Sequence, residues 1–433
     1  PVFTDYALLI FAHKNVYDGI TVEYPVADII LALQSGVGLY SFDPNLFSFT
    51  IGSISTSITS SSVTSNTISL ANTDHFITQQ HSDDKYNNTI WTGQYSNNYD
   101  LISLRSDLNA NQNTSLASGS NLASMTQSGN SVAILEISSY GSGRVVKWNE
   151  YNWASESILG PVYGMDDLLW RSIVWAARKP FVMQGFPPII TMRVDDVDGT
   201  GLEGTIANDF EWISISNGYG FAPWCGTFTI PAEKIPIFKT FLDANNATAS
   251  PHAFSYESSI YFNHEGDLIF DPVINTQTAH AFYTNNELKM SKLLIPHYYE
   301  IDPLALGEIQ NMGIEFMGTH MDIGDPYNDF WINCAPFRTY MDVWGRSSDP
   351  LPVSYSGNIS NGSFTFFNCV TEIRDDQGYE WYITGRTNAD IIGQGVRQLS
   401  RSLNSMVLST LFTHQDQLGI SAQNWSNILS EIR

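Results

Sequence analysis

The chain has 433 residues, which is longer than a chain that folds around a single hydrophobic core usually is, so we expect two domains. Its 20 basic and 44 acidic residues give a net charge of −24, which disfavours nucleic acids and anionic membranes as partners and favours neutral or cationic ones. No run of about 18 apolar residues occurs, so no membrane-spanning segment is expected. The sequence does not indicate an oligomeric state.

Several features favour an extracellular or cell-wall location. The chain starts at Pro1 rather than Met, as it would after removal of a signal peptide or after another trimming of its start. Lysine is scarce, while Ser, Thr, Asn and aromatic residues are abundant, which is typical of a secreted, fungal type of glycoprotein. Glycosylation sequons, about as many as chance gives in a chain this rich in Asn, Ser and Thr, permit secretion; they begin at Asn87, Asn113, Asn246, Asn358, Asn361 and Asn424. Of three cysteines, Cys334 and Cys369 are the pair that we expect to be bridged, which leaves Cys225 free.

The first half of the chain predicts an α/β domain over residues 1–185. Alternation and apolar runs predict strands, helical spacing predicts helices, and an Asn/Ser-rich stretch predicts loops. Residues 165–180 form an amphipathic pattern that ends at Pro180. The expected elements are strands at 6–12, 131–138 and 142–149, edge strands within 50–69, helices at 22–35 and 165–180, and loops over 87–129.

The second half predicts a (β/α) barrel over residues 186–433. A segment with two prolines and a glycine, residues 181–188, is typical of a linker between domains. Apolar strands then alternate with helical patterns, which favours a parallel sheet. The expected strands are 189–196, 220–228, 248–256, 293–300, 313–320 and the end of 402–414, with helices at 232–243, 303–312 and 421–432.

Carboxylates and histidines fall at the ends of these predicted strands. The first strand ends in Asp195 and Asp196, and the later ones end in His252, His297, His320 and His414. In (β/α) barrels the C-terminal ends of the strands carry the chemistry. One histidine at such a place is ordinary, but four histidines together with an aspartate pair predict a functional site.

Adjacent carboxylates repel each other, and a fold tolerates the pair when a metal ion takes one of them. One aspartate and two histidines suit zinc or another divalent cation and leave a position open for water. The second carboxylate can then act as a base. The alternative is that Asp195, Asp196 and Asp198 form a calcium loop or cap a helix, although no glutamate occupies the twelfth position of such a loop.

Three motifs resemble those of the polysaccharide deacetylase superfamily. Val194-Asp195-Asp196 matches the first motif, in which the first aspartate is the general base and the second binds metal. Leu411-Phe412-Thr413-His414, followed by a last helix, matches the motif whose histidine is the general acid. Phe337-Arg338-Thr339-Tyr340 is a weaker match to the motif whose arginine orients the base. The resemblance covers about 250 residues, from Pro187 onward.

The chain departs from the family where two metal-binding histidines usually lie four residues apart. Gly324 follows His320 at that spacing, and Tyr256 follows His252. The ligands beside Asp196 would therefore be two of His252, His297 and His320, with His252 and His320 ranked first. In this departure the chain resembles the secreted fungal galactosaminogalactan deacetylases.

The N-terminal half resembles a different family. A Gly-x-Gly-Arg-Val strand, a Trp-rich loop and a helix ending in Ile-Val-Trp-Ala-Ala-Arg resemble the last third of class I glutamine-amidotransferase-like domains, which have a flavodoxin-like α/β fold. The nucleophile of the glutaminases in that family is a cysteine, and none precedes Cys225. The resemblance therefore implies a scaffold or a binding surface without glutaminase chemistry.

Together the resemblances imply a metal-dependent, most simply zinc-dependent, N-deacetylase acting on an amino-sugar polysaccharide such as galactosaminogalactan or chitin. One alternative is a metal-independent glycoside hydrolase that uses Asp196 with Glu315 or Asp322. Another is a carbohydrate-binding or cell-wall protein on a degenerate deacetylase fold. Aromatic residues near strand ends could stack on sugar rings: Trp224, Tyr256, Tyr298, Tyr299, Trp331 and Trp344.

Overall fold

The computed structural model divides into two compact units, Pro1–Pro187 with Ser400–Val407 and Pro188–Leu399 with Leu408–Arg433. Both contain helices and strands, so the predicted α/β class is confirmed. No helix of the described residues is long and apolar enough to cross a membrane. The structure describes residues 2–12, 24–43, 46–48, 54, 56–79, 101–149, 165–178, 189–263, 268–297, 301–319, 341–343, 351–353, 358–359, 362–363, 365–368, 372–373, 381–404 and 409–433.

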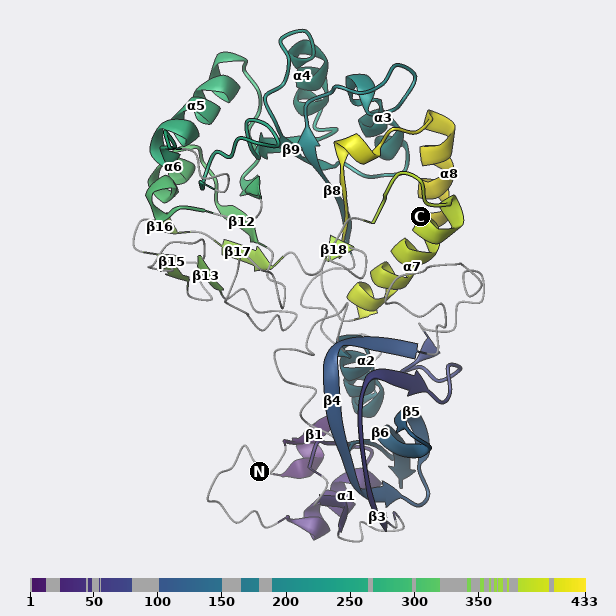
Figure 1. Cartoon of the computed structure of the whole chain (residues 1–433). Helices are drawn as coiled ribbons and strands as arrows, with labels where there is room; N and C mark the ends of the chain where they lie inside the picture. Colours follow the sequence, from purple (N-terminus) through teal and green to yellow (C-terminus); the bar gives the residue numbers. More distant parts are fainter. Residues whose placement is uncertain are drawn as a thin grey trace. The chain divides into compact units, whose positions relative to one another are not determined.

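The N-terminal unit is built on a seven-stranded mixed sheet in the order β1-β2-β7-β6-β5-β3-β4 (Figure 1). Strands β1, β2 and β7 are parallel, and the remaining pairs are antiparallel. Only three strands thus share the parallel arrangement of a flavodoxin-like sheet. The elements are β1 (Leu8–Phe11), α1 (Val26–Gln34), β2 (Gly38–Ser41), β3 (Thr56–Leu70), β4 (Leu101–Leu116), β5 (Ser120–Gln127), β6 (Asn130–Tyr140), β7 (Gly143–Trp148) and α2 (Asp166–Ala177).

The prediction of loops over 87–129 is wrong for its described part, because β4 and β5 make up most of residues 101–127. The apolar residues of β4 alternate with polar ones, and Ile102, Leu104, Leu108 and Ala110 are buried in the core of the unit. Packing of the apolar face of β4 against the core stabilises the strand, although the composition of the segment is polar. The Ser/Thr-rich strand β3 also lies inside the sheet, between β5 and β4, rather than at its edge.

The C-terminal unit contains a five-stranded sheet in the order β10-β9-β8-β19-β18 and a three-stranded sheet in the order β11-β12-β17, all parallel. These strands are β8 (Ile190–Val197), β9 (Trp224–Thr227), β10 (Thr248–Pro251), β11 (Leu293–Leu294), β12 (Phe316–Thr319), β17 (Thr365–Asn368), β18 (Glu372–Ile373) and β19 (Ser409–His414). Two short hairpins pair β13 (Met341–Val343) with β14 (Leu351–Val353) and β15 (Asn358–Ile359) with β16 (Gly362–Ser363).

The two parallel sheets follow the strand order of a barrel. Hydrogen bonds from Ser291 N to Ala249 O (2.6 Å) and from His297 N to His252 O (3.2 Å) connect the β11 side to β10. The strands β8, β9, β10, β11, β12 and β17 therefore lie side by side in the order of the sequence. The last strand, β19, pairs with β18 on one side and with β8 on the other. Among the described residues, β10 and β11 are joined by these two bonds rather than by a strand ladder, and no ladder pairs β17 with β18.

Helices lie outside these strands (Figure 1), which is the layering expected when parallel strands are joined by helical crossovers. Asp271 caps α5 by accepting hydrogen bonds from Val273 N and Ile274 N, and Ser421 caps α8 through Asn424 N. The helices are α3 (Glu211–Gly218), α4 (Ile235–Asp243), α5 (Pro272–Asn285), α6 (Leu306–Asn311), α7 (Asn388–Asn404) and α8 (Ala422–Ile432).

The strand order brings the C-terminal ends of β8, β10 and β19 to the same edge of the unit. His414, the last residue of β19, pairs in register with Asp195 of β8. Cys225 on β9 is a buried free thiol, as expected, while Cys334 and Cys369 lie outside the described residues. Several of the residues predicted to carry chemistry therefore gather at this edge.

Candidate metal centre

A β-bulge at the end of β8 brings the adjacent side chains of Asp195 and Asp196 toward the same point. Val194 pairs with Cys225 and Val197 pairs with Thr227, so two residues of β8 face one residue, Gly226, of β9. Asp196 takes the left-handed backbone conformation, with φ of 58°. In a regular strand these neighbours would face opposite sides. Here Asp195 Oδ2 and Asp196 Oδ1 lie 3.5 Å and 3.6 Å from the same atom, Nε2 of His252.

Asp195 is held by Arg193, two residues earlier on the same face of β8. Arg193 Nε donates to Asp195 Oδ1 at 2.7 Å, and Arg193 Nη2 forms an ion pair with Asp195 Oδ2. Both residues are 2% exposed. Burial raises the pKa of Asp195, but the charge and hydrogen bonds of Arg193 outweigh it and lower this pKa to about 2. Asp195 is therefore a carboxylate at neutral pH.

Arg193 is itself fixed from two sides by aromatic rings. Its guanidinium carbon lies 4.6 Å from the ring centroid of Phe412, its register partner on β19, and 5.9 Å from that of Trp224. Trp224 Nε1 donates to Leu293 O at 3.1 Å. Trp224 is 6% exposed, so it belongs to the core and offers no face on which a sugar ring could stack.

A backbone hydrogen bond fixes the orientation and the tautomer of His252. Its Nδ1 lies 2.7 Å from Ile295 O, which can only accept, so Nδ1 carries the proton and Nε2 carries a lone pair. Burial lowers the pKa of His252 to about 4, although the carboxylate of Asp195 raises it. His252 is therefore neutral at pH 7 and presents Nε2 toward Asp196, as a metal ligand does.

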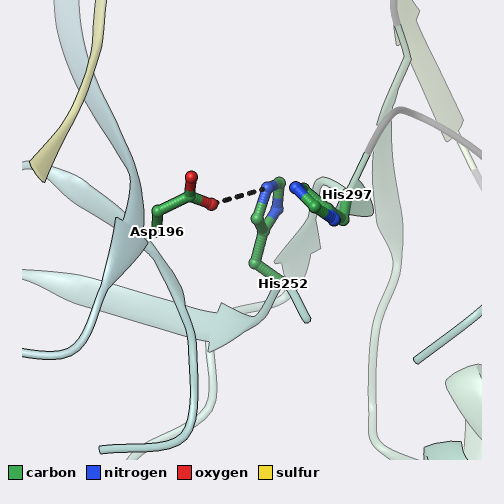
Figure 2. A group of neighbouring side chains, drawn as sticks. All are labelled: Asp196, His252 and His297. Carbon is green, nitrogen blue, oxygen red and sulfur yellow. Dashed lines mark ion pairs between the residues drawn. The ribbon is translucent and has the colours of Figure 1, made fainter. Parts of the chain in front are cut away.

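His297 completes a group of three potential ligands with Asp196 and His252 (Figure 2). One ligand atom from each residue lies within 4.8 Å of the others. The imidazole centroids of His252 and His297 are 5.0 Å apart, and Phe228 packs near both rings. Since one residue comes from β8 and the histidines follow β10 and β11, the group forms only when these three segments are side by side.

The donor atoms of this group fit a cation. The 3.6 Å between His252 Nε2 and Asp196 Oδ1 exceeds the usual N–H···O length, and a neutral His252 has no proton at Nε2 to share. An unprotonated nitrogen and a carboxylate oxygen repel each other unless a positive charge lies between them. Zinc bonds of about 2.0–2.1 Å in tetrahedral geometry place ligand atoms roughly 3.4 Å apart. Asp196, His252 and His297 could therefore hold a metal ion.

His414 lies on the other side of Asp196 from His252 along the strand order. Its Nε2 is 3.9 Å from Asp196 Oδ2, and its side chain is 31% exposed, whereas that of His252 is 2% exposed. The ring of Phe412 packs against it, with centroids 5.1 Å apart. His414 is therefore placed beside the group with access to solvent, which suits exchange of a proton.

Asp198 has a structural role in the loop after β8. Its Oδ1 accepts hydrogen bonds from Thr200 N at 2.8 Å and from Gln415 Nε2 at 2.9 Å. Gln415 Oε1 also accepts from Gly199 N at 3.1 Å. Gly199 has φ of 76°, and a Cβ there would lie 2.3 Å from the ring of Phe210. Asp198 thus ties this loop to the residue after His414, which leaves the calcium-loop alternative without geometric support.

The predicted site residues divide into two sets. Asp195, Asp196, His252, His297 and His414 come together as described. His320 and Arg338 lie outside the described residues, so their roles as metal ligand and as orienting arginine stay predictions. Arg193 makes the contact to Asp195 that we expected from Arg338. We did not single out Arg193 from the sequence. The signal was available, because residues at i and i+2 of a strand share a face, so Arg193-Val194-Asp195 places both side chains together.

Glu315 does not fit the glycoside-hydrolase alternative. It precedes β12, at the opposite end of the parallel strands from Asp196, and its Oε1 pairs with Lys292 Nζ at 2.5 Å on an exposed surface. A hydrolase of that type needs two carboxyl groups roughly 5–9.5 Å apart across one bond. The other predicted partner, Asp322, lies outside the described residues.

Replacing Arg193 by lysine is expected to lower kcat/KM of any reaction that uses Asp195 by about tenfold to a hundredfold, because lysine cannot form the two parallel hydrogen bonds. Burial would then raise the pKa of Asp195 with less opposition. The acid limb of the pH profile should therefore move to higher pH, which a profile from pH 4 to 8 would reveal. Exposed Arg433 changed to lysine serves as the control. An active variant with an unshifted profile would contradict a role of Arg193 in keeping Asp195 ionised.

Comparisons with known proteins leave the family open. No protein-family model matches the chain, and no curated protein matches it. Among solved structures, one match is a Mycobacterium smegmatis protein provisionally assigned as a polysaccharide deacetylase. It is 12% identical, the match covers 56% of this chain and 82% of that one, and the TM-score is 0.34. A TM-score of this size does not establish a common fold, so functional inference depends on the residues of the site.

Proposed function

We propose that the chain is a metal-dependent hydrolase that removes N-acetyl groups from an amino-sugar polysaccharide. The observation that carries this proposal is one constellation: three potential metal ligands, Asp196, His252 and His297, beside a carboxylate, Asp195, that Arg193 keeps ionised. The motifs around Asp195 and His414 that resemble the polysaccharide deacetylase superfamily support the same reaction class.

Zinc is the proposed metal, because one carboxylate and two imidazoles form a donor set that zinc favours and that leaves room for water or substrate. When bound, such a cation lowers the pKa of a water molecule and polarises the acetamide carbonyl. The Nδ1 hydrogen bond of His252 to Ile295 O holds its ring in the orientation that ligation requires.

Two residues are proposed to move protons. Asp195 accepts the proton of the attacking water, and Arg193 orients its carboxylate for that task. His414 donates a proton to the departing amine, from a position beside Asp196 with solvent access. The base and the acid lie on adjacent strands, β8 and β19, so that they can act on opposite sides of one acetamide group. The bond between the carbonyl carbon and the nitrogen breaks between them.

An amino-sugar polymer is the proposed substrate, with galactosaminogalactan or chitin as the types to test. Deacetylation turns a neutral sugar into a cationic one, and a chain with a net charge of −24 attracts the product. Such polymers occur outside the cell, so we place the protein in the secreted or cell-wall fraction. The composition, rich in Ser, Thr, Asn and aromatic residues, supports this location.

Acetate release from partly acetylated galactosamine and glucosamine polymers tests the proposal. The full chain is assayed as purified, after a chelator, and after zinc is restored. We expect release that the chelator abolishes and zinc recovers, with the preferred polymer giving the higher rate. Absence of release from every polymer, in a protein that also binds no zinc, would overturn the proposal and favour a carbohydrate-binding protein without catalysis.

A further inference from the structure

A tyrosine is displayed in solvent beside the metal-ligand group. Tyr256 is 65% exposed, yet its ring centroid lies 6.1 Å from that of His297, with the planes at 66°. It follows His252 by four residues, in the connection between β10 and α5. Trp224 by contrast is 6% exposed, so Tyr256 is an aromatic ring near the group whose face is open to a ligand in solvent.

The backbone holds Tyr256 on a tight turn. Phe254 N donates to Ser258 O at 2.8 Å, and Ser258 N donates to Ser255 O at 3.2 Å, so Tyr256 and Glu257 are the central residues between the bridged Ser255 and Ser258. Thr229 N donates to Phe254 O at 3.0 Å, which connects this turn to the segment after β9. A ring on a turn fixed at both ends loses little conformational freedom when a ligand stacks on it.

We propose that Tyr256 is a stacking platform for a sugar ring of the polymer, next to the residue whose acetamide enters the site; this inference rests on the proposed function. Pyranose rings have an apolar face of C–H groups, which packs on an aromatic face while the hydroxyl groups stay in water. Tyrosine combines such a face with a polar tip and has few rotatable bonds. Glu257, exposed on the same turn, can accept hydrogen bonds from sugar hydroxyl groups.

Binding and turnover measured on the same variants test this platform. Binding of an N-acetylated galactosamine or glucosamine hexamer is measured by calorimetry in the presence of chelator, where no turnover occurs, and acetate release is measured with zinc. Tyr256→Ala should weaken hexamer binding and raise KM by about fivefold to twentyfold, with kcat changed less than KM. Tyr256→Phe should bind within about twofold of the wild type. Tyr6, 52% exposed in the N-terminal unit, gives the matched control Tyr6→Ala.

The outcomes separate this inference from the proposed function. If Tyr256→Ala binds the hexamer and turns it over as the wild type does, the platform is overturned while deacetylation stands. If Tyr256→Ala instead loses zinc affinity, the tyrosine only supports His297, and the platform is again overturned. If the wild type releases no acetate but binds the hexamer through Tyr256, deacetylation fails and the platform stands.

Discussion

Replacing Asp195 by asparagine is expected to lower kcat for acetate release by a factor of about 10² to 10⁴, because an amide cannot accept the proton of the attacking water. The asparagine side chain would keep the shape of the aspartate and one hydrogen bond from Arg193. Asp195 is not one of the three potential ligands, so the variant should still bind zinc. Acetate release and zinc content, measured on the same preparation, check both halves of this expectation.

Two further measurements make the Asp195→Asn result interpretable. The change leaves the buried charge of Arg193 less well compensated, which can cost a few kcal/mol of stability, so thermal unfolding must show a folded variant at the assay temperature. Asp243→Asn, the same chemical change at an exposed residue paired with Lys239 on α4, is the control. A folded, zinc-loaded Asp195→Asn protein with full activity would exclude Asp195 as the base.

Replacing Asp196 by asparagine is expected to weaken zinc binding by at least about a hundredfold and to abolish acetate release. Loss of a residue that only hydrogen-bonds to a metal ligand already lowers metal affinity about 10–100-fold. Asp196 is itself a potential ligand and contributes the one carboxylate of the group. Asparagine is the suitable replacement, because it tolerates the left-handed backbone of residue 196, whereas alanine would add strain there. The loss can then be attributed to the missing charge.

Zinc-dependent thermal stabilisation gives a readout that does not require activity. A ligand that binds the folded chain raises its unfolding temperature, so zinc should stabilise the metal-free wild type and leave Asp196→Asn unchanged. His297→Asn should behave like Asp196→Asn, while His280→Asn, on α5 and outside the group, should behave like the wild type. Equal stabilisation of the wild type and the Asp196 variant would show that this group does not hold the metal.

Local patterns in the sequence predicted most elements near the site. The apolar segment before Asp195, the strand that ends at His414 and the amphipathic pattern of α8 all lie where they were expected. These patterns are reliable because burial of one face imposes a fixed period on each element. The polar stretch that forms β4 was misjudged, since its composition is typical of loops and only its alternation indicates a strand.

The residue types of the candidate site could also be read from the chain, but their grouping could not. Four histidines follow predicted strands, and no spacing in the sequence tells which two approach Asp196. The structure brings His252 and His297 together because β10 and β11 are connected side by side and share hydrogen bonds at their ends. Sequence resemblance ranked His320 above His297, and His320 lies outside the described residues.

By itself, the sequence determined the α/β class, the aspartate pair at the end of a strand, and histidines at the ends of later strands, because strand periodicity and strand ends are local properties. Tertiary structure decided two further points: the bulge that directs both carboxylates to one place and the tautomer of His252. Each of these depends on a neighbouring strand or a distant carbonyl group, and their positions follow from the packing of the whole barrel.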